Sequence, residues 1–144
     1  MNTKIQHTKI DAIYACVPEQ EILTTEYSLF SPDEARLFTK NTGIHARRVA
    51  ADHVTCSDLC YSAASQLLSD IGDASEIDLL VFVSQSPDYF LPATSIILQD
   101  RLGLRSDCMA FDINLGCSGY IYGLQVVGQF IQSGAVRNAF LLVG

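Results

Sequence analysis

The chain is organised around one stretch, Phe111-Asp112-Ile113-Asn114-Leu115-Gly116-Cys117-Ser118-Gly119-Tyr120. The pattern predicts a buried strand that runs through a tight turn into a helix, with Cys117 where the helix begins. A helix N-terminus favours negative charge through its free N–H groups and its dipole, and the thiolate is the nucleophilic form of cysteine. Gly116 and Gly119 allow the backbone and a substrate to approach closely. Cys117 is therefore a candidate nucleophile.

A second interpretation of Cys117 is structural. Free cysteine is among the most buried residue types, and it commonly packs as a small hydrophobic side chain. A strand, a turn and a helix would surround a core cysteine in the same way, so the spacing alone leaves both interpretations open.

The composition indicates one soluble α/β domain with a sizeable core. The chain has 144 residues, of which 49% are hydrophobic and 17% are charged, and this balance argues against disorder. The net charge of −7 and the lack of a basic run argue against nucleic acid as a partner. The five cysteines show no disulfide-scaffold spacing, and the N-terminus shows no signal-peptide pattern. We therefore expect a cytoplasmic protein.

Residues 113–136 contain no charged side chain, and their length alone would permit a membrane span. However, Gln125, Gln129 and Gln132 line one face of the predicted helix, and glycines interrupt the remaining surface. We therefore predict a helix buried within a soluble protein, with no membrane as a partner.

Strands and helices alternate along the chain. We expect strands at 4–17, 77–84, 107–113 and 138–143, an extended or loop segment at 43–51, and helices at 32–40, 56–70, 93–102 and 117–133, the first with a capping box from Ser31 and Glu34. The order predicts a layered α/β domain with a mixed, largely parallel five-stranded sheet. Ligands bind beyond the carboxyl ends of such strands, where we place the loops 84–92 and 114–119.

Cys56 and Cys60 stand four residues apart on the predicted helix 56–70 and could face one metal ion. No histidine or third cysteine is near them in the sequence, so packing is the better interpretation and we predict no metal site. The chain also lacks a Walker loop and the glycine spacing of a dinucleotide-binding fold.

Three segments together resemble one family, β-ketoacyl-acyl-carrier-protein synthase III of the thiolase superfamily. Residues 111–124 and 134–144 resemble its nucleophile region, residues 86–104 resemble its substrate loop and the helix that follows, and residues 41–50 resemble its T-G-I-x-x-R segment. The resemblance covers most of the chain. It implies that residues 1–144 form an N-terminal thiolase-like domain, one of the two halves of the full fold, with the C-terminal half absent.

The resemblance implies an acyltransferase that needs no metal or redox cofactor. The Cys117 thiolate would attack the thioester of an acyl-CoA or an acyl carrier protein and become acylated, while nearby backbone N–H groups stabilise the oxyanion. A malonyl-acyl carrier protein would then be decarboxylated, and its carbanion would form the carbon–carbon bond. The implied pathway is fatty-acid or specialised acyl or polyketide biosynthesis.

The chain also departs from the family. Members supply a catalytic histidine and an asparagine from their second half, which His7, His45 and His53 do not match, so the resemblance implies that the 144 residues alone are inactive. The family's tryptophan that stacks on CoA and its arginine near the phosphates correspond here to Leu37 and Asn41. These replacements favour a carrier-protein donor or an unusual acyl donor.

The resemblance also implies substrate-binding residues. Arg47 and Arg48 could contact phosphate, although solvated surface arginines are an equal alternative. In the family, the residue before the proline of the substrate loop reaches across a homodimer and limits the partner's acyl pocket, and Leu91, with Phe90, matches that position. Edge strands join such dimers, and we expect residues 107–113 to do so here.

Two other functions stay open at this point. An acylated Cys117 could pass its group to an amine or a hydroxyl without forming a carbon–carbon bond, as some relatives do. The chain could instead be a non-catalytic partner subunit with a vestigial site, although its intact Cys117-Ser118-Gly119 block argues against this.

Overall fold

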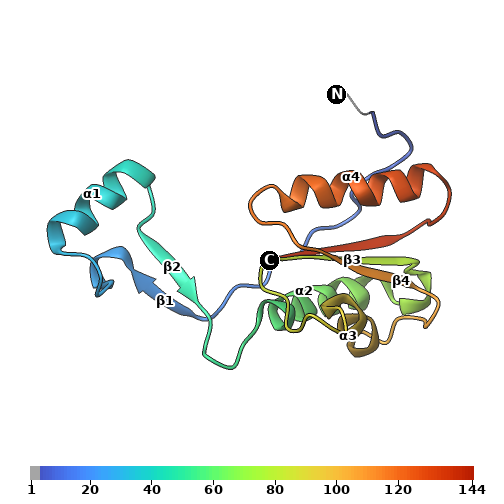
Figure 1. Cartoon of the computed structure of the whole chain (residues 1–144), viewed down its shortest axis with the longest axis horizontal. Helices are drawn as coiled ribbons and strands as arrows, with labels where there is room; N and C mark the ends of the chain where they lie inside the picture. The colour runs from blue at the N-terminus through green and yellow to red at the C-terminus, as the bar shows by residue number, and fades with distance from the viewer. Residues whose placement is uncertain (1–3) are drawn as a thin grey trace. The chain divides into compact units, whose positions relative to one another are not determined.

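The computed structural model describes residues 4–144, which form two compact units. The first unit consists of the chain up to Cys16 together with Cys56–Gly144, and the second is Val17–Thr55. The elements of the first unit are α2 (Cys56–Ile71), the 3-10 helix η2 (Ala74–Glu76), β3 (Leu79–Val83), α3 (Thr94–Arg101), β4 (Met109–Ile113), α4 (Gly119–Gln132) and β5 (Ala139–Val143), as Figure 1 shows.

The sheet of the first unit is parallel and has β3 at its centre. The strand order is β4-β3-β5, and Val83 pairs with both Ile113 and Val143. All three strands therefore end at the same edge, where the loops after β3 and β4 also begin. The sequence-based prediction that these two loops share one edge is confirmed.

Strand β3 is buried on both faces because helices cover both sides of the sheet (Figure 1). Leu80 and Phe82 pack in a core cluster with residues of α2 and α3, such as Ala64 and Leu98. The alternate residues of β3 pack in a second cluster with Val127 of α4. A strand enclosed in this way needs an apolar side chain at every position, which explains the continuous run at 79–83.

Helix α4 lies close to the sheet, and its glycines make this possible. A Cβ atom on Gly119 would stand 2.5 Å from the Val83 Cγ1 atom. A Cβ atom on Gly123, one turn further along, would stand 2.7 Å from the Leu141 Cδ1 atom. Both separations are too short for real carbon atoms. The Val83 side chain is short and branched and cannot swing away, so the helix can occupy this position only with glycine at 119, whereas the end of the Leu141 side chain would have to move for a larger residue at 123.

The second unit is a small antiparallel pair with one helix. Its elements are β1 (Gln20–Leu23), the 3-10 helix η1 (Thr24–Glu26), α1 (Pro32–Thr42) and β2 (Ala46–Val49), and β1 pairs with β2. The capping box predicted for α1 is confirmed, because Ser31 and Glu34 each accept a hydrogen bond from the other's backbone N–H. Gly43 ends the helix in the left-handed conformation, with φ of 74°.

The prediction of one five-stranded sheet is wrong. The described residues form a three-stranded parallel sheet and a separate two-stranded pair, and residues 4–18 form no strand. In that segment polar residues such as His7, Lys9 and Asp11 alternate with apolar ones and are exposed. A strand covered on both faces would bury these polar side chains, at a cost of several kcal/mol if they found no partners.

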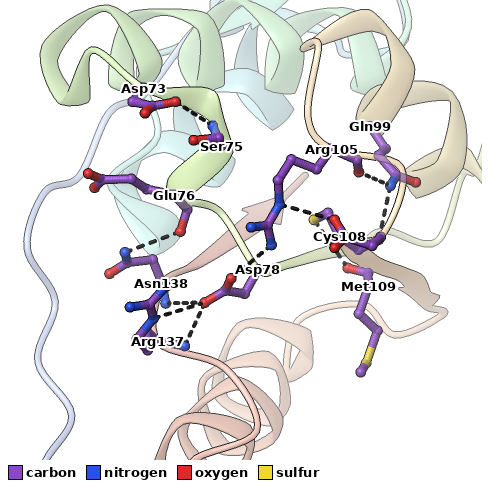
Figure 2. Close-up of polar contacts among 11 residues, drawn as sticks. Asp73, Ser75, Glu76, Asp78, Gln99, Arg105, Cys108, Met109, Arg137 and Asn138 are labelled. Carbon is purple, nitrogen blue, oxygen red and sulfur yellow. Dashed lines mark hydrogen bonds and ion pairs between the residues drawn. The ribbon is translucent and has the colours of Figure 1, made fainter.

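Asp78 ties together the amino ends of the three parallel strands (Figure 2). Its carboxylate accepts hydrogen bonds from the Arg137 backbone N–H (2.8 Å) and the Arg105 guanidinium (3.0 Å). Its backbone N–H donates to the Asn138 carbonyl, and its carbonyl accepts from the Met109 N–H, both at 2.9 Å. The hydrogen bonds, foremost that from the Arg137 N–H, hold the pKa of Asp78 below its ordinary value against the opposing effect of burial.

The contact between α4 and β3 predicts the effect of one added methyl group. Gly119→Ala should lower the free energy of unfolding by about 1–2 kcal/mol, because the clash with Val83 exceeds the gain in helix propensity. Urea unfolding measures the change. In a Val83→Ala background the same substitution should cost less, and an unchanged cost would contradict the proposed contact.

The network around Asp78 predicts a pH-dependent stability. A carboxylate with a lowered pKa stabilises the fold above the ordinary aspartate pKa of about 4, and this stabilisation is lost as the pH falls through the lowered value. Asp78→Asn should therefore cost about 1–3 kcal/mol at pH about 7 and much less at pH about 3 by urea unfolding. The matched control is Asp107→Asn, since Asp107 also pairs with Arg105 but has a side chain 77% exposed. A similar loss in both variants would contradict the assignment.

Candidate active site

Cys117 lies in the turn between β4 and α4, and its side chain is exposed. The turn is held by its own backbone, because the Gly119 N–H donates to the Gly116 carbonyl at 2.6 Å and the Leu115 N–H donates to the Ile113 carbonyl at 3.0 Å. The interpretation of Cys117 as a core packing residue is therefore wrong. The strand, the turn and the helix present the thiol to solvent at the carboxyl edge of the sheet.

The thiol opens onto a cavity of about 390 Å³. The walls come from the ends of β3 and β5, from the two loops that follow β3 and β4, and from the first turn of α4. The lining residues are Val83, Gln85, Ser86, Leu115, Gly116, Cys117, Tyr120, Val143 and Gly144. The Gln85 side chain lies over Gly116 in this wall, since a Cβ atom at position 116 would stand 1.5 Å from the Gln85 Nε2 atom.

Helix α4 begins two residues after Cys117. The helix has 14 residues, and its first turn carries no acidic side chain. The partial positive charge of this helix end is therefore not offset by a carboxylate within the helix's first turn. A helix N-terminus of this kind favours a negatively charged group bound beside it.

Asp112 of β4 caps α3 from outside that helix. Its carboxylate accepts hydrogen bonds from the Thr94 N–H (2.9 Å) and the Ser95 N–H (2.8 Å), while Ala93 at the N-cap has no side chain that could do so. These two hydrogen bonds fix the start of α3, and with it the end of the loop 84–92. This role was not predicted from the sequence, although a single carboxylate in an otherwise apolar strand is a signal for a partner.

Side chains also brace the loop after β3 from within. The Asp88 N–H donates to Thr94 Oγ1 at 3.0 Å, and the Asp88 carboxylate accepts a hydrogen bond from the Ser57 hydroxyl at 2.6 Å. The Ser86 N–H donates to Ser84 Oγ at 3.1 Å. The loop is therefore anchored both to α2 and to α3.

The segment that contains Cys117 is also the one that matches a known protein family. Residues 111–144 match the family model of 3-oxoacyl-[acyl-carrier-protein] synthase III. The β-ketoacyl-[acyl-carrier-protein] synthase III proteins of Alkalilimnicola ehrlichii and Xanthomonas campestris are 34% identical over 140 residues and 35% identical over 139 residues. Each alignment covers 96% of this chain, and 43% and 42% of the respective relative.

Solved structures agree with the sequence comparison. The 3-oxoacyl-(acyl-carrier protein) synthase of Burkholderia xenovorans superposes with a TM-score of 0.84 at 40% identity, over 88% of this chain and 37% of the other. Xanthomonas campestris OleA superposes with a TM-score of 0.79 at 28% identity, over 91% of this chain and 43% of the other.

The chain belongs among the β-ketoacyl-acyl-carrier-protein synthase III-like proteins of the thiolase superfamily. Its α/β architecture is part of the thiolase-like fold. The chain spans about two fifths of the length of the relatives it matches, as the coverages of 43% and 37% show. The resemblance inferred from the sequence is confirmed at this level.

Phe90 and Leu91 protrude from the loop of this synthase III-like chain. Their side chains are 97% and 87% exposed, and neither contributes to the core clusters. Exposure of two large apolar side chains side by side is typical of a surface that contacts another protein or a ligand. Their assignment to the substrate pocket of a partner subunit remains a prediction.

Arg47 and Arg48 belong to the second unit, on strand β2. The Arg47 guanidinium stacks on the Tyr27 ring, 3.8 Å from its centre. Arg48 pairs with the Glu21 carboxylate at 3.1 Å and donates to the Glu19 carbonyl at 2.7 Å. Both charges therefore have partners within the unit. Phosphate binding by these arginines remains a prediction.

Within residues 4–144, no group of three or more histidine, cysteine, aspartate or glutamate side chains is placed to hold a metal ion. Among the helices of the same range, none combines the length and the apolar character that a membrane span requires.

The cap on α3 predicts a local change in exchange rates. Asp112→Ala should speed amide hydrogen exchange at Thr94 and Ser95 and lower the free energy of unfolding by about 1–2 kcal/mol, because both N–H groups lose their acceptor. Asp100→Ala, at the other end of the same helix, is the control. Unchanged protection of Thr94 and Ser95 in Asp112→Ala would contradict the cap.

Proposed function

We propose that Cys117 is the acyl-accepting nucleophile of a condensing enzyme of the β-ketoacyl-acyl-carrier-protein synthase III type. The observation that carries this proposal is the position of Cys117: an exposed thiol, at the start of a helix, in the cavity at the carboxyl edge of a parallel sheet. The family model matches the same segment, residues 111–144. The proposed donor is an acyl-CoA or an acyl carrier protein, and the proposed acceptor is a malonyl-acyl carrier protein.

The proposed first step is a transfer of the acyl group to sulfur. The Cys117 thiolate attacks the thioester carbonyl, and the resulting oxyanion accepts hydrogen bonds from backbone N–H groups at the start of α4. When the carbonyl re-forms, the carbon–sulfur bond to the donor breaks and the donor leaves as a thiolate. The helix N-terminus favours both negative charges, that of the attacking sulfur and that of the oxyanion.

The proposed second step forms the carbon–carbon bond. The malonyl thioester loses carbon dioxide, and its carbanion attacks the carbonyl of the acylated Cys117 and expels the Cys117 thiolate. We propose that residues 1–144 correspond to the N-terminal half of such an enzyme, and that the other half supplies the groups that assist decarboxylation. This assignment is supported by relatives that are more than twice as long, since the chain covers 43% of one of them.

The proposed assembly is a homodimer. Strand β4 lies at an edge of its sheet, so its outer N–H and C=O groups can extend the sheet into a second copy. In the proposed dimer, Phe90 and Leu91 of one protomer narrow the acyl cavity of its partner. Their exposure of 97% and 87% supports this role, because each is available for such a contact.

Acylation of Cys117 is tested by intact-mass measurement of the protein after incubation with acyl-CoA and with acyl carrier protein thioesters. The wild-type protein should gain the mass of one acyl group, and Cys117→Ala should gain none, because the nucleophile is removed. Cys108→Ala is the matched control and should be acylated like the wild type, since Cys108 is buried. An adduct that persists in Cys117→Ala would reject the proposal.

A further inference from the structure

Three of the five cysteines line a second cavity, which adjoins the cavity of Cys117. The cavity has a volume of about 430 Å³, and its walls come from residues 10–16, helix α2 and the end of β5. Cys16, Cys56 and Cys60 all line it. Acyl transfer at Cys117 uses none of these thiols, so their grouping is unexplained by the proposed function.

Cys56 and Cys60 are coupled to each other through their side chains. The Cys60 thiol donates a hydrogen bond to the Cys56 sulfur, and with a weaker contribution from Ser84 this lowers the pKa of Cys56 well below the ordinary thiol value, although burial and the Asp88 carboxylate oppose the shift. The same hydrogen bond raises the pKa of Cys60. The coupling within the pair thus favours ionisation of Cys56 over that of Cys60.

Geometry distinguishes the two possible disulfide partners of Cys56. Cys56 and Cys60 lie one turn apart on α2, where Cβ atoms are about 5–6 Å from each other, while a disulfide needs about 3.5–4.5 Å. A bond between them would distort the first turn of the helix. Cys16 lies in a segment without regular secondary structure, so its backbone can adjust without breaking helical hydrogen bonds.

We propose that Cys16, Cys56 and Cys60 form a peroxide-reactive thiol site that closes a disulfide between Cys16 and Cys56. The Cys56 thiolate attacks one oxygen of a peroxide, the O–O bond breaks, and the other oxygen leaves as hydroxide or alkoxide, so that Cys56 becomes a sulfenic acid. The Cys16 sulfur then attacks the Cys56 sulfur, and water leaves as the disulfide forms. The peroxide takes up the two electrons. Cys60 is a positioning residue that keeps Cys56 reactive.

The proposed disulfide joins the two residues that flank the second unit in the sequence. Cys16 is the last residue before the second unit, and Cys56 is the first residue after it. A bond between them closes the loop that carries the whole unit Val17–Thr55. The cavity also shares Tyr120, Val143 and Gly144 with the cavity of Cys117. A movement of these shared residues on disulfide formation would therefore also change the shape of the proposed active site. The thiol site does not depend on the proposed function.

The decisive measurement is a peptide map of the wild-type protein after treatment with hydrogen peroxide, with and without dimedone. We expect a linked pair of peptides that contain Cys16 and Cys56. In Cys16→Ser, dimedone should label Cys56, because the sulfenic acid is no longer resolved. In Cys60→Ala, the oxidation of Cys56 should be about tenfold slower at neutral pH, because the hydrogen bond from the Cys60 side chain is lost.

The control is the buried Cys108, which should react far more slowly than Cys56. Oxidation of Cys117 appears on a separate peptide, so it does not obscure the result. The proposal is overturned if Cys56 reacts no faster than Cys108 in the wild-type protein, or if the linked peptide joins Cys56 to Cys60 or Cys117. Because these outcomes are read from the wild type, a variant that fails to fold does not affect them.

Discussion

Helix α4 can lie against β3 only because Gly119 faces Val83 without a side chain. This close approach sets the distance between the helix axis and the sheet. Gly123 makes a second close approach one turn later, to Leu141. The start of the helix is thereby held at the carboxyl edge of β3 and β4. The turn that carries Cys117 leads directly into this helix. The position of the proposed nucleophile thus follows from a packing constraint.

Much of this arrangement follows from local sequence patterns. The unbroken apolar run at 79–83 predicts a strand enclosed on both faces, and the structure places it at the centre of a parallel sheet. The capping residues of α1 and the glycines that end the helices predict most helix boundaries to within about two residues. The turn at 114–118 is predictable because a strand pattern gives way to a helix pattern there.

The features that the sequence did not reveal depend on contacts between distant residues. The first expected strand, at 4–17, is absent. An alternation of polar and apolar residues does not by itself show that a sheet has an edge at which such a strand could pair. Asp112 could not be assigned to α3, because its partners Thr94 and Ser95 lie 17 and 18 residues away in sequence. The grouping of Cys16 with Cys56 likewise arises because the second unit leaves and rejoins the first at these two residues.

The two ends of β3 have different physical roles. At its amino end, Asp78 connects all three parallel strands through backbone and side-chain hydrogen bonds. These bonds satisfy the polar groups that a buried strand start would otherwise leave unpaired, and they hold the register of the sheet. At its carboxyl end, the loop after Val83 is braced by side chains and lines the cavity of Cys117. Because the register is fixed at one end, the proposed nucleophile in the turn after a neighbouring strand is placed accurately at the other.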